Sequence, residues 1–191
     1  MITDSYHRLS NLMPHPFFED FLAIGTERTL DKGEEFVRAG EIPRKVAFVL
    51  SGLFRYYYID KEGVDYTKSI ILEGSMLASY SAMINASPSY FFIQALEPAH
   101  LLEVNWNQWN QLQKKDRFWD QFLIKMLEKG FVTKERRERE LLLWDAETRY
   151  RSFLEHYPRL ENRLTQRIVA SYLGIHPESL SRIRKKLKAL T

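Results

Sequence analysis

Cysteine is absent from the chain. Without thiolates the protein can form no disulfide, no cysteine-ligated zinc or iron–sulfur site and no cysteine nucleophile. The five histidines show no spacing typical of metal ligands. No apolar stretch is long enough to cross a bilayer, and the first residues lack the basic and apolar blocks of a signal peptide. We therefore expect a cytoplasmic protein without a membrane partner.

Paired carboxylates, or a nucleophile beside a base, are also missing in any recognisable arrangement, so we expect no enzyme. The 191 residues allow one large or two small domains. The net charge of +3 is unevenly distributed, because residues 161–191 contain seven lysines and arginines but only two acidic residues. The preceding residues are slightly acidic in sum. This asymmetry is typical of a chain whose C-terminal end binds a polyanion.

The segment 166–186 has the pattern of a helix-turn-helix. Gly174 suits the turn, and Pro177 suits the first turn of a second helix, where its missing N–H has no intrahelical partner. Ala170 is small enough for the two helices to cross closely. Apolar residues occupy the positions that such a unit buries, namely Val169, Leu173, Ile175, Leu180 and Ile183.

The second of these helices carries the candidate DNA-binding residues. A recognition helix presents its N-terminal residues to base edges in the major groove. Arg182 suits guanine and Glu178 suits cytosine, whereas later lysines suit phosphates. A solvated basic helix would carry similar charges, and it is the turn pattern that favours DNA binding. The candidates are Glu178, Ser179, Ser181, Arg182, Lys185 and Lys186.

Residues 28–104 predict short antiparallel strands in a sandwich or barrel. Apolar or β-rich runs recur at short intervals, and glycines close them at positions 33, 40, 52, 63 and 74. Such spacing with turn signals between the runs is typical of all-β domains. The expected strands lie at 45–50, 53–59, 66–72, 90–96 and 100–104.

From residue 105 the pattern becomes helical. A short helix is expected at 106–112, a long one at 117–143, which holds no proline and one glycine, and another at 145–156. Phe118, Trp119, Phe122 and Met126 form a stripe on the long helix. This stripe is either a dimer seam or a cover for the β domain, and the two-fold symmetry of helix-turn-helix dimers favours the seam. Gly130 would allow a second helix to approach closely.

The order of β-roll, long helix and C-terminal helix-turn-helix resembles the CRP/FNR family of bacterial transcription regulators. The segment KGEEFVRAGEIPRKVAFVLSGLFRYYYIDKEGVDYTKSIILEG looks like the family's cyclic-nucleotide-binding roll, and GIHPESLSRIRKKL is similar to its recognition helix. The resemblance implies an α+β fold in three parts. They are an antiparallel jelly-roll sensor with flanking helices (1–115), a dimerisation helix (116–143) and a helix-turn-helix domain (144–191). Family members commonly contact bases where Glu178, Ser179 and Arg182 stand.

The sensor departs from the family pattern at two positions. The glutamate for the ribose and the arginine for the cyclic phosphate fall on Ser79 and Ser89, and 70–98 contains no lysine or arginine. A hydroxyl binds a buried phosphate more weakly than an arginine does, so we expect no conventional cyclic nucleotide and no other cofactor. The residues Ser79, Tyr80, Ser81, Ser89 and Tyr90 either line a pocket for another small molecule or form a ligand-free remnant whose hydroxyls bond to nearby backbone.

Few residues follow the recognition helix, and they leave no room for the two-stranded wing that the family carries there. We expect a truncated or absent wing and salt-sensitive DNA binding. The prediction is a homodimeric transcription regulator that binds double-stranded DNA, with RNA polymerase as the further partner that a regulator would meet. The alternative is a small-molecule-binding or protein-interaction module whose helix-turn-helix is only structural.

Overall fold

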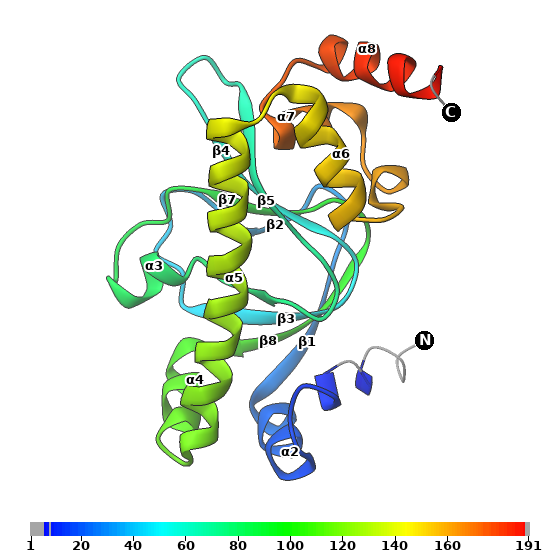
Figure 1. Cartoon of the computed structure of the whole chain (residues 1–191). Coiled ribbons are helices and arrows are strands. Elements are labelled where there is room, and N and C mark those ends of the chain that lie inside the picture. The colour runs from blue at the N-terminus through cyan, green and yellow to red at the C-terminus, as the bar shows by residue number, and fades with distance from the viewer. Residues whose placement is uncertain (1–5, 8, 190–191) are drawn as a thin grey trace.

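Two antiparallel sheets face each other in the computed structural model, which describes residues 6–7 and 9–189 (Figure 1). One sheet has the strand order β1 (Gly25–Leu30), β8 (Ala99–Asn105), β3 (Lys45–Ser51) and β6 (Met76–Leu77). The other has the order β2 (Glu35–Val37), β7 (Phe92–Ala95), β4 (Phe54–Ile59) and β5 (Asp65–Ile71). Each sheet therefore takes strands from both ends of the segment, which confirms the predicted jelly-roll.

All five predicted strand segments contain a strand, namely β3, β4, β5, β7 and β8. The strands β1, β2 and β6 have no clear sequence signal. Two of them are three and two residues long, and β1, with the sequence GTERTL, has only one apolar residue long enough to reach the core. Short strands of this kind form because their neighbours supply the hydrogen-bonding edge.

The hydrophobic core between the sheets consists of aliphatic and aromatic side chains. The turn at Gly52 brings two chain segments together in this region, with φ at +98°. A Cβ atom at this position would lie 2.6 Å from the Cβ of Ala99, so only glycine fits. The largest fully buried residues of this core are Leu30, Phe36, Phe54, Leu77, Ile93 and Leu101.

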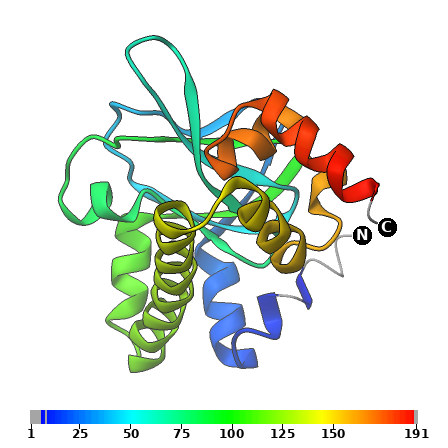
Figure 2. The same ribbon diagram turned by 45° about the horizontal axis from the view of Figure 1, so that its top comes forward.

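Three helices cover the first sheet: α2 (His15–Ile24), α4 (Trp106–Gln113) and α5 (Arg117–Leu143). Figure 2 shows them side by side below the sheets. Trp119 and Phe122 of α5 are buried within the chain, and Trp119 stacks on Phe21. The expected dimer seam is therefore wrong for these two residues, because their rings fill the space between α5 and its own sensor domain. Along the described chain no helix is long and apolar enough to cross a membrane.

The C-terminal helices are α6 (Ala146–His156), the short 3-10 helix η1 (Leu160–Asn162), α7 (Gln166–Leu173) and α8 (Pro177–Lys188). They share a core with the sensor, in which Leu53, Ile70 and Leu96 of the roll meet Phe153 and Leu173. A further short helix, α3 (Tyr80–Ile84), lies on the other side of the roll. Asp145 caps α6 by accepting a hydrogen bond from the N–H of Thr148.

Candidate nucleic-acid interface and sensor interior

The helix-turn-helix has the predicted local geometry. Thr165 caps α7 by accepting from the N–H of Ile168. The helix ends at Leu173 and is followed by Gly174, whose φ of +66° lies in the left-handed region. Pro177 is the first residue of α8. Ala170 is fully buried at the crossing of the two helices. Each of these positions agrees with the sequence pattern, so the helix-turn-helix itself is confirmed.

The exposed face of α8 presents charged side chains to solvent. Glu178, Arg182 and Lys185 are exposed, and the described chain gives neither Arg182 nor Lys185 an ion pair. Lys186 is also exposed, but its ammonium lies 2.6 Å from the carboxylate of Glu147. The two remaining candidates, Ser179 and Ser181, are half-buried.

Arg184 has a different role from its basic neighbours. Its guanidinium turns inward and donates to the hydroxyl of Tyr150 and to the carboxylate of Glu161, both at 3.1 Å. Tyr150 donates in turn to Glu161. This arginine therefore fixes α8 against α6 and η1, and leaves the other basic residues of α8 to face outward.

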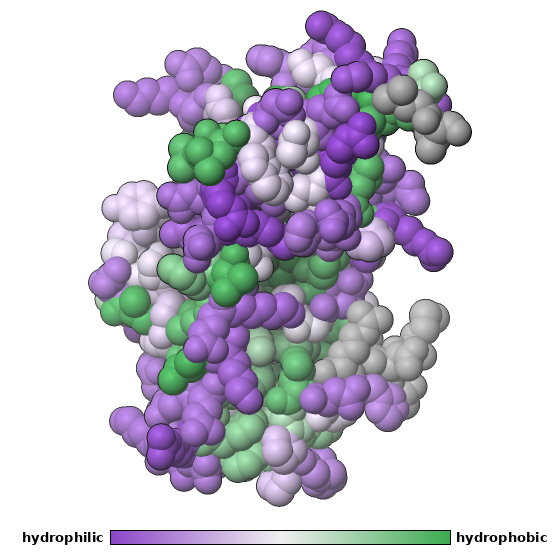
Figure 3. All heavy atoms as spheres, viewed as in Figure 1, coloured by the Kyte–Doolittle hydropathy of each residue, from purple (hydrophilic) through white to green (hydrophobic). Residues whose placement is uncertain are grey.

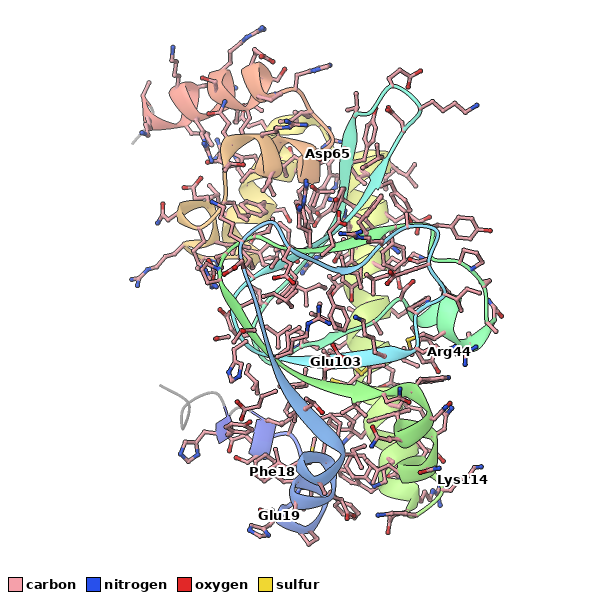
Figure 4. All side chains as sticks on the ribbon, turned by 180° about the vertical axis from the view of Figure 1, so that it is seen from behind. Phe18, Glu19, Arg44, Asp65, Glu103 and Lys114 are labelled. Carbon is pink, nitrogen blue, oxygen red and sulfur yellow. The ribbon has the colours of Figure 1, made fainter. Side chains whose placement is uncertain are left out.

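The helix-turn-helix is held against the sensor through β5. The hydroxyl of Ser171 on α7 accepts from the N–H of Thr67 at 2.8 Å and donates to the carbonyl of Asp65 at 3.1 Å. The carboxylate of Asp65 also lies 3.2 Å from Arg55 and 3.5 Å from Arg167. Figure 4 shows Asp65 where the β4–β5 hairpin meets α7.

A second contact between the two parts centres on one arginine. Arg163 pairs with Glu97 and, at 2.5 Å, with Glu73, both from the roll. These ion pairs are partly exposed, so each contributes only a few tenths of a kcal/mol to about 1 kcal/mol. The apolar contact of Leu53, Ile70 and Leu96 with the C-terminal helices supplies the larger share of the docking free energy.

The five predicted pocket residues do not converge. Ser79 and Ser89 are buried, and their hydroxyl oxygens lie 2.9 Å apart. Ser89 also donates to the carbonyl of Phe91 at 2.8 Å. Ser81 is exposed, Tyr90 is 84% exposed, and Tyr80 packs edge-on against Trp106. The two serines thus satisfy each other and the local backbone, as in the ligand-free alternative, and the remaining three point elsewhere.

Known proteins resemble this chain in both sequence and fold. Residues 27–116 match the model of the cyclic nucleotide-binding domain. The fumarate and nitrate reduction regulatory protein of Vibrio cholerae is 25% identical over 173 residues, which cover 84% of this chain and 68% of that protein. FixK2 from Bradyrhizobium japonicum superposes with a TM-score of 0.77 at 20% identity, covering 87% of this chain and 86% of its own. CooA from Carboxydothermus hydrogenoformans gives a TM-score of 0.75 at 19% identity, covering 96% and 84%.

The chain has the fold of the CRP/FNR-type regulators. A third structure, the c-di-GMP responsive global regulator CLP of Xanthomonas campestris, has the same fold, with a TM-score of 0.76 at 17% identity over 91% of both chains. The two-sheet roll, the 27-residue helix α5 and the C-terminal helix-turn-helix are therefore the parts of the fold that this chain shares with these structures. The expected lack of a wing partly concerns residues 190–191, which lie outside the described residues.

One residue inside this CRP/FNR-type roll has no sequence signal of its own. Tyr56 packs against the core, stacks on Phe91 at 5.1 Å between ring centroids, and accepts a hydrogen bond from the N–H of Ala78 at 3.0 Å. Burial raises the pKa of Tyr56 to about 12. The residue belongs to the run Tyr56-Tyr57-Tyr58, which indicates a strand but not which tyrosine enters the interior. Tyr56 therefore contacts Ala78, the residue before Ser79, and Phe91, to whose carbonyl Ser89 donates.

A shallow cavity of about 390 Å³ lies elsewhere, between α2 and the edge of the first sheet. Tyr6 donates its hydroxyl to Glu27 at the rim. The cavity lies on the side of the roll that faces α2, near the Phe18 label in Figure 4. Its lining residues are Tyr6, Phe18, Leu22, Gly25, Glu27 and Leu102.

Proposed function

We propose that the chain is a homodimeric, sequence-specific DNA-binding transcription regulator. The observation that carries the proposal is the outer face of α8, at the end of a well-formed helix-turn-helix. There Arg182 and Lys185 are exposed, and neither has an ion pair among the residues that the structure describes. Unpaired cations on such a helix suit the phosphates and base edges of duplex DNA. The curated relative and the similar structures, which include regulators by name, support the same function.

Each candidate residue receives a role in this proposal. Arg182 donates to guanine O6 and N7, and Glu178 accepts from cytosine N4. Ser179 and Ser181 contact the edge of the major groove, near the bases that Glu178 and Arg182 contact. Lys185 and Lys186 contact phosphates. To do so, Lys186 gives up its ion pair with Glu147 and pairs with a phosphate instead. The chain divides accordingly into a sensor (1–115), a dimerisation helix (116–143) and a DNA-binding domain (144–191).

The proposed dimer interface lies on the exposed part of α5 from Ile124 to Val132. Ile124, Phe131 and Val132 are 52%, 65% and 64% exposed, although they are large and apolar. A Cβ at Gly130 would meet nothing else in the described chain within 4 Å, apart from its own helix and chain neighbours. Figure 3 shows apolar patches along the side of the molecule that α5 crosses in Figure 1. A second copy of α5 would cover these residues and place two recognition helices for two half-sites.

Conventional cyclic nucleotides do not gate this regulator in our proposal. A cyclic phosphate needs a charge-assisted partner when it is buried. The positions for such a partner hold Ser79 and Ser89, whose hydroxyls are bonded to each other. A large saturable thermal shift on titration with cAMP would contradict this part of the proposal.

The test of the main function is a gel shift with two duplexes of equal length and base composition. One is selected by the protein from genomic fragments, and the other is a scrambled version of it. The proposal expects the selected duplex to bind more tightly at every salt concentration, with both affinities falling as salt rises. Equal affinity for the two duplexes contradicts sequence-specific binding. Failure to bind either duplex at low salt favours the interaction module whose helix-turn-helix is only structural.

A further inference from the structure

The edge strand β1 presents little apolar surface to the helix α2 that lies beside it. This strand is the outermost of its sheet, and its Gly25 pairs with Val104 of β8. Two positions on, Glu27 pairs with Leu102. Paired residues of antiparallel strands lie on the same face of a sheet. The β8 residues of these pairs belong to the core under the covering helices, whereas β1 contributes a glycine and a glutamate. The edge therefore lacks the side chains that would fill the space beside α2.

This space is the cavity of about 390 Å³ described above, which we call the α2 cavity. Its volume lies within the range of about 300–1,000 Å³ that small-molecule pockets occupy. Phe18 and Leu22 line it from α2, one helical turn apart, and Leu102 lines it from β8. A Cβ at Gly25 would lie 2.5 Å from a methyl carbon of Leu102, so any larger residue would force that leucine to shift. The cavity thus depends on the glycine.

Glu27 is the one charged residue among those that line the α2 cavity. One oxygen of its half-exposed carboxylate accepts from the hydroxyl of Tyr6, and the other lies 3.0 Å from Nε2 of His100. Burial, together with the hydrogen bond to Glu27, raises the pKa of Tyr6 to about 12, so this hydroxyl keeps its proton and remains the donor. Each carboxylate oxygen can accept two hydrogen bonds, so Glu27 can take a further donor from a ligand.

Two aromatic rings lie beside this carboxylate. Tyr6 and Phe18 meet edge to face, with their ring centroids 6.3 Å apart. The faces of aromatic rings attract organic cations. An anion would be repelled by Glu27 and would meet no lysine or arginine among the lining residues. The combination of one carboxylate, two rings and aliphatic side chains therefore suits a cation attached to an apolar body.

We propose that the α2 cavity binds a small organic amine in its ammonium form. The ammonium group donates to the carboxylate of Glu27 by charge-assisted hydrogen bonds. The apolar body of the amine lies against Phe18, Leu22 and Leu102, where its burial contributes the rest of the affinity. The site lies between α2 and the edge strand β1, and it does not depend on whether the chain binds DNA.

The test is isothermal titration calorimetry of the full chain with four probes at neutral pH and constant ionic strength. At this pH an alkylamine is protonated, as a lysine side chain is. Phenethylamine carries both the cation and the apolar body, 2-phenylethanol carries the same body without charge, 3-phenylpropionate carries it with an anion, and ethylamine carries the cation with little apolar body. We expect saturable binding of phenethylamine, weaker binding of the alcohol, and no binding of the other two.

Matched variants locate the binding. Glu27→Gln keeps the shape of the side chain and should weaken phenethylamine by about tenfold or more, which is about 1.4 kcal/mol, while the alcohol binds as before. Leu22→Trp fills the cavity and should abolish binding of both. Glu19→Gln removes a carboxylate from the exposed face of the same helix, next to Phe18, and should change neither affinity (Figure 4). Glu27 is exposed, so its variant keeps the test decisive if Leu22→Trp unfolds.

Three outcomes overturn the proposal. The first is that phenethylamine does not bind the wild type at millimolar concentration. The second is that 2-phenylethanol binds as tightly as phenethylamine, or that Glu27→Gln leaves the affinity for the amine unchanged, since the carboxylate would then have no part in recognition. The third is that Glu19→Gln weakens the amine as much as Glu27→Gln does, which would indicate non-specific attraction to an acidic surface.

Discussion

The recognition helix and the sensor interior treat their polar side chains in opposite ways. On α8, Arg182 and Lys185 stand in solvent without an ion pair within the described chain. Inside the roll, Ser79 bonds to Ser89, and Tyr56 accepts from the N–H of Ala78. Polar groups that are satisfied internally hold a structure together, whereas unpaired ones on a rigid element are available to a partner. The contrast places the proposed output on the surface of α8 and leaves little of the expected pocket in the roll.

The largest effect is expected from Phe131→Glu. This substitution should disrupt the proposed dimer and so separate the two recognition helices. A charge at this exposed apolar position should prevent α5 from pairing, so each recognition helix would bind one half-site alone. Loss of bivalent binding should reduce operator affinity by about a hundredfold or more. Sedimentation measures the dimer and a gel shift measures the affinity. Glu138→Gln on the same helix is the control, and a stable dimer of the Phe131 variant would remove this interface from the proposal.

Arg182→Ala tests whether the exposed face of α8 reads bases. Loss of a bidentate contact to guanine should cost about 1–3 kcal/mol on the selected duplex and far less on the scrambled one. The ratio of the two dissociation constants is the measurement. The charge-matched comparison is Arg184→Ala, which removes the inward guanidinium and should instead lower the melting temperature. Unchanged preference in the Arg182 variant would show that this arginine does not contact a base.

Tyr56→Phe tests the polar groups inside the roll, because it removes the hydroxyl that accepts from Ala78. The N–H of Ala78 would lose its acceptor, which should cost about 1–2 kcal/mol of the free energy of unfolding. The pKa of Tyr56 is raised to about 12, so its neutral form stabilises the fold below pH 10, and this contribution is lost as the pH rises to about 12. The difference between wild type and variant in urea unfolding should therefore shrink above pH 10. A constant difference across that range would contradict the buried role of the hydroxyl.

The smallest effect is expected from Lys186→Ala. Lys186 already pairs with Glu147, so its phosphate contact is partly offset by the lost pair. Binding of the selected and scrambled duplexes should weaken alike, and the slope of log affinity against log salt should fall by about one. Affinities at several salt concentrations give that slope. A change of sequence preference in this variant would move Lys186 from the phosphates to the bases.

The helical part of the fold could be predicted from the sequence because its signals are local. The bounds of α5 at Arg117 and Leu143 agree with the predicted segment, and Gly174 and Pro177 mark the turn before α8. The sensor interior could not be predicted in the same way. Strand β5 bulges at Lys68, which has no partner on β4, and both this bulge and the inward position of Tyr56 depend on how the two strands pair. The burial of Trp119 likewise depends on the packing of α2 and α4.

The helix α5 also has a mechanical consequence. Its first turns are rooted in the sensor through Trp119 and Phe122, and Arg137 holds its far part to β5. Between Trp119 and Leu143 the helix measures about 36 Å, at 1.5 Å per residue. A tilt of about 5° at the rooted end would displace the far end by about 3 Å. That displacement is comparable to the 2.8 Å hydrogen bond from Thr67 of β5 to Ser171, so a small repacking around Trp119 would strain the polar contact between the helix-turn-helix and β5.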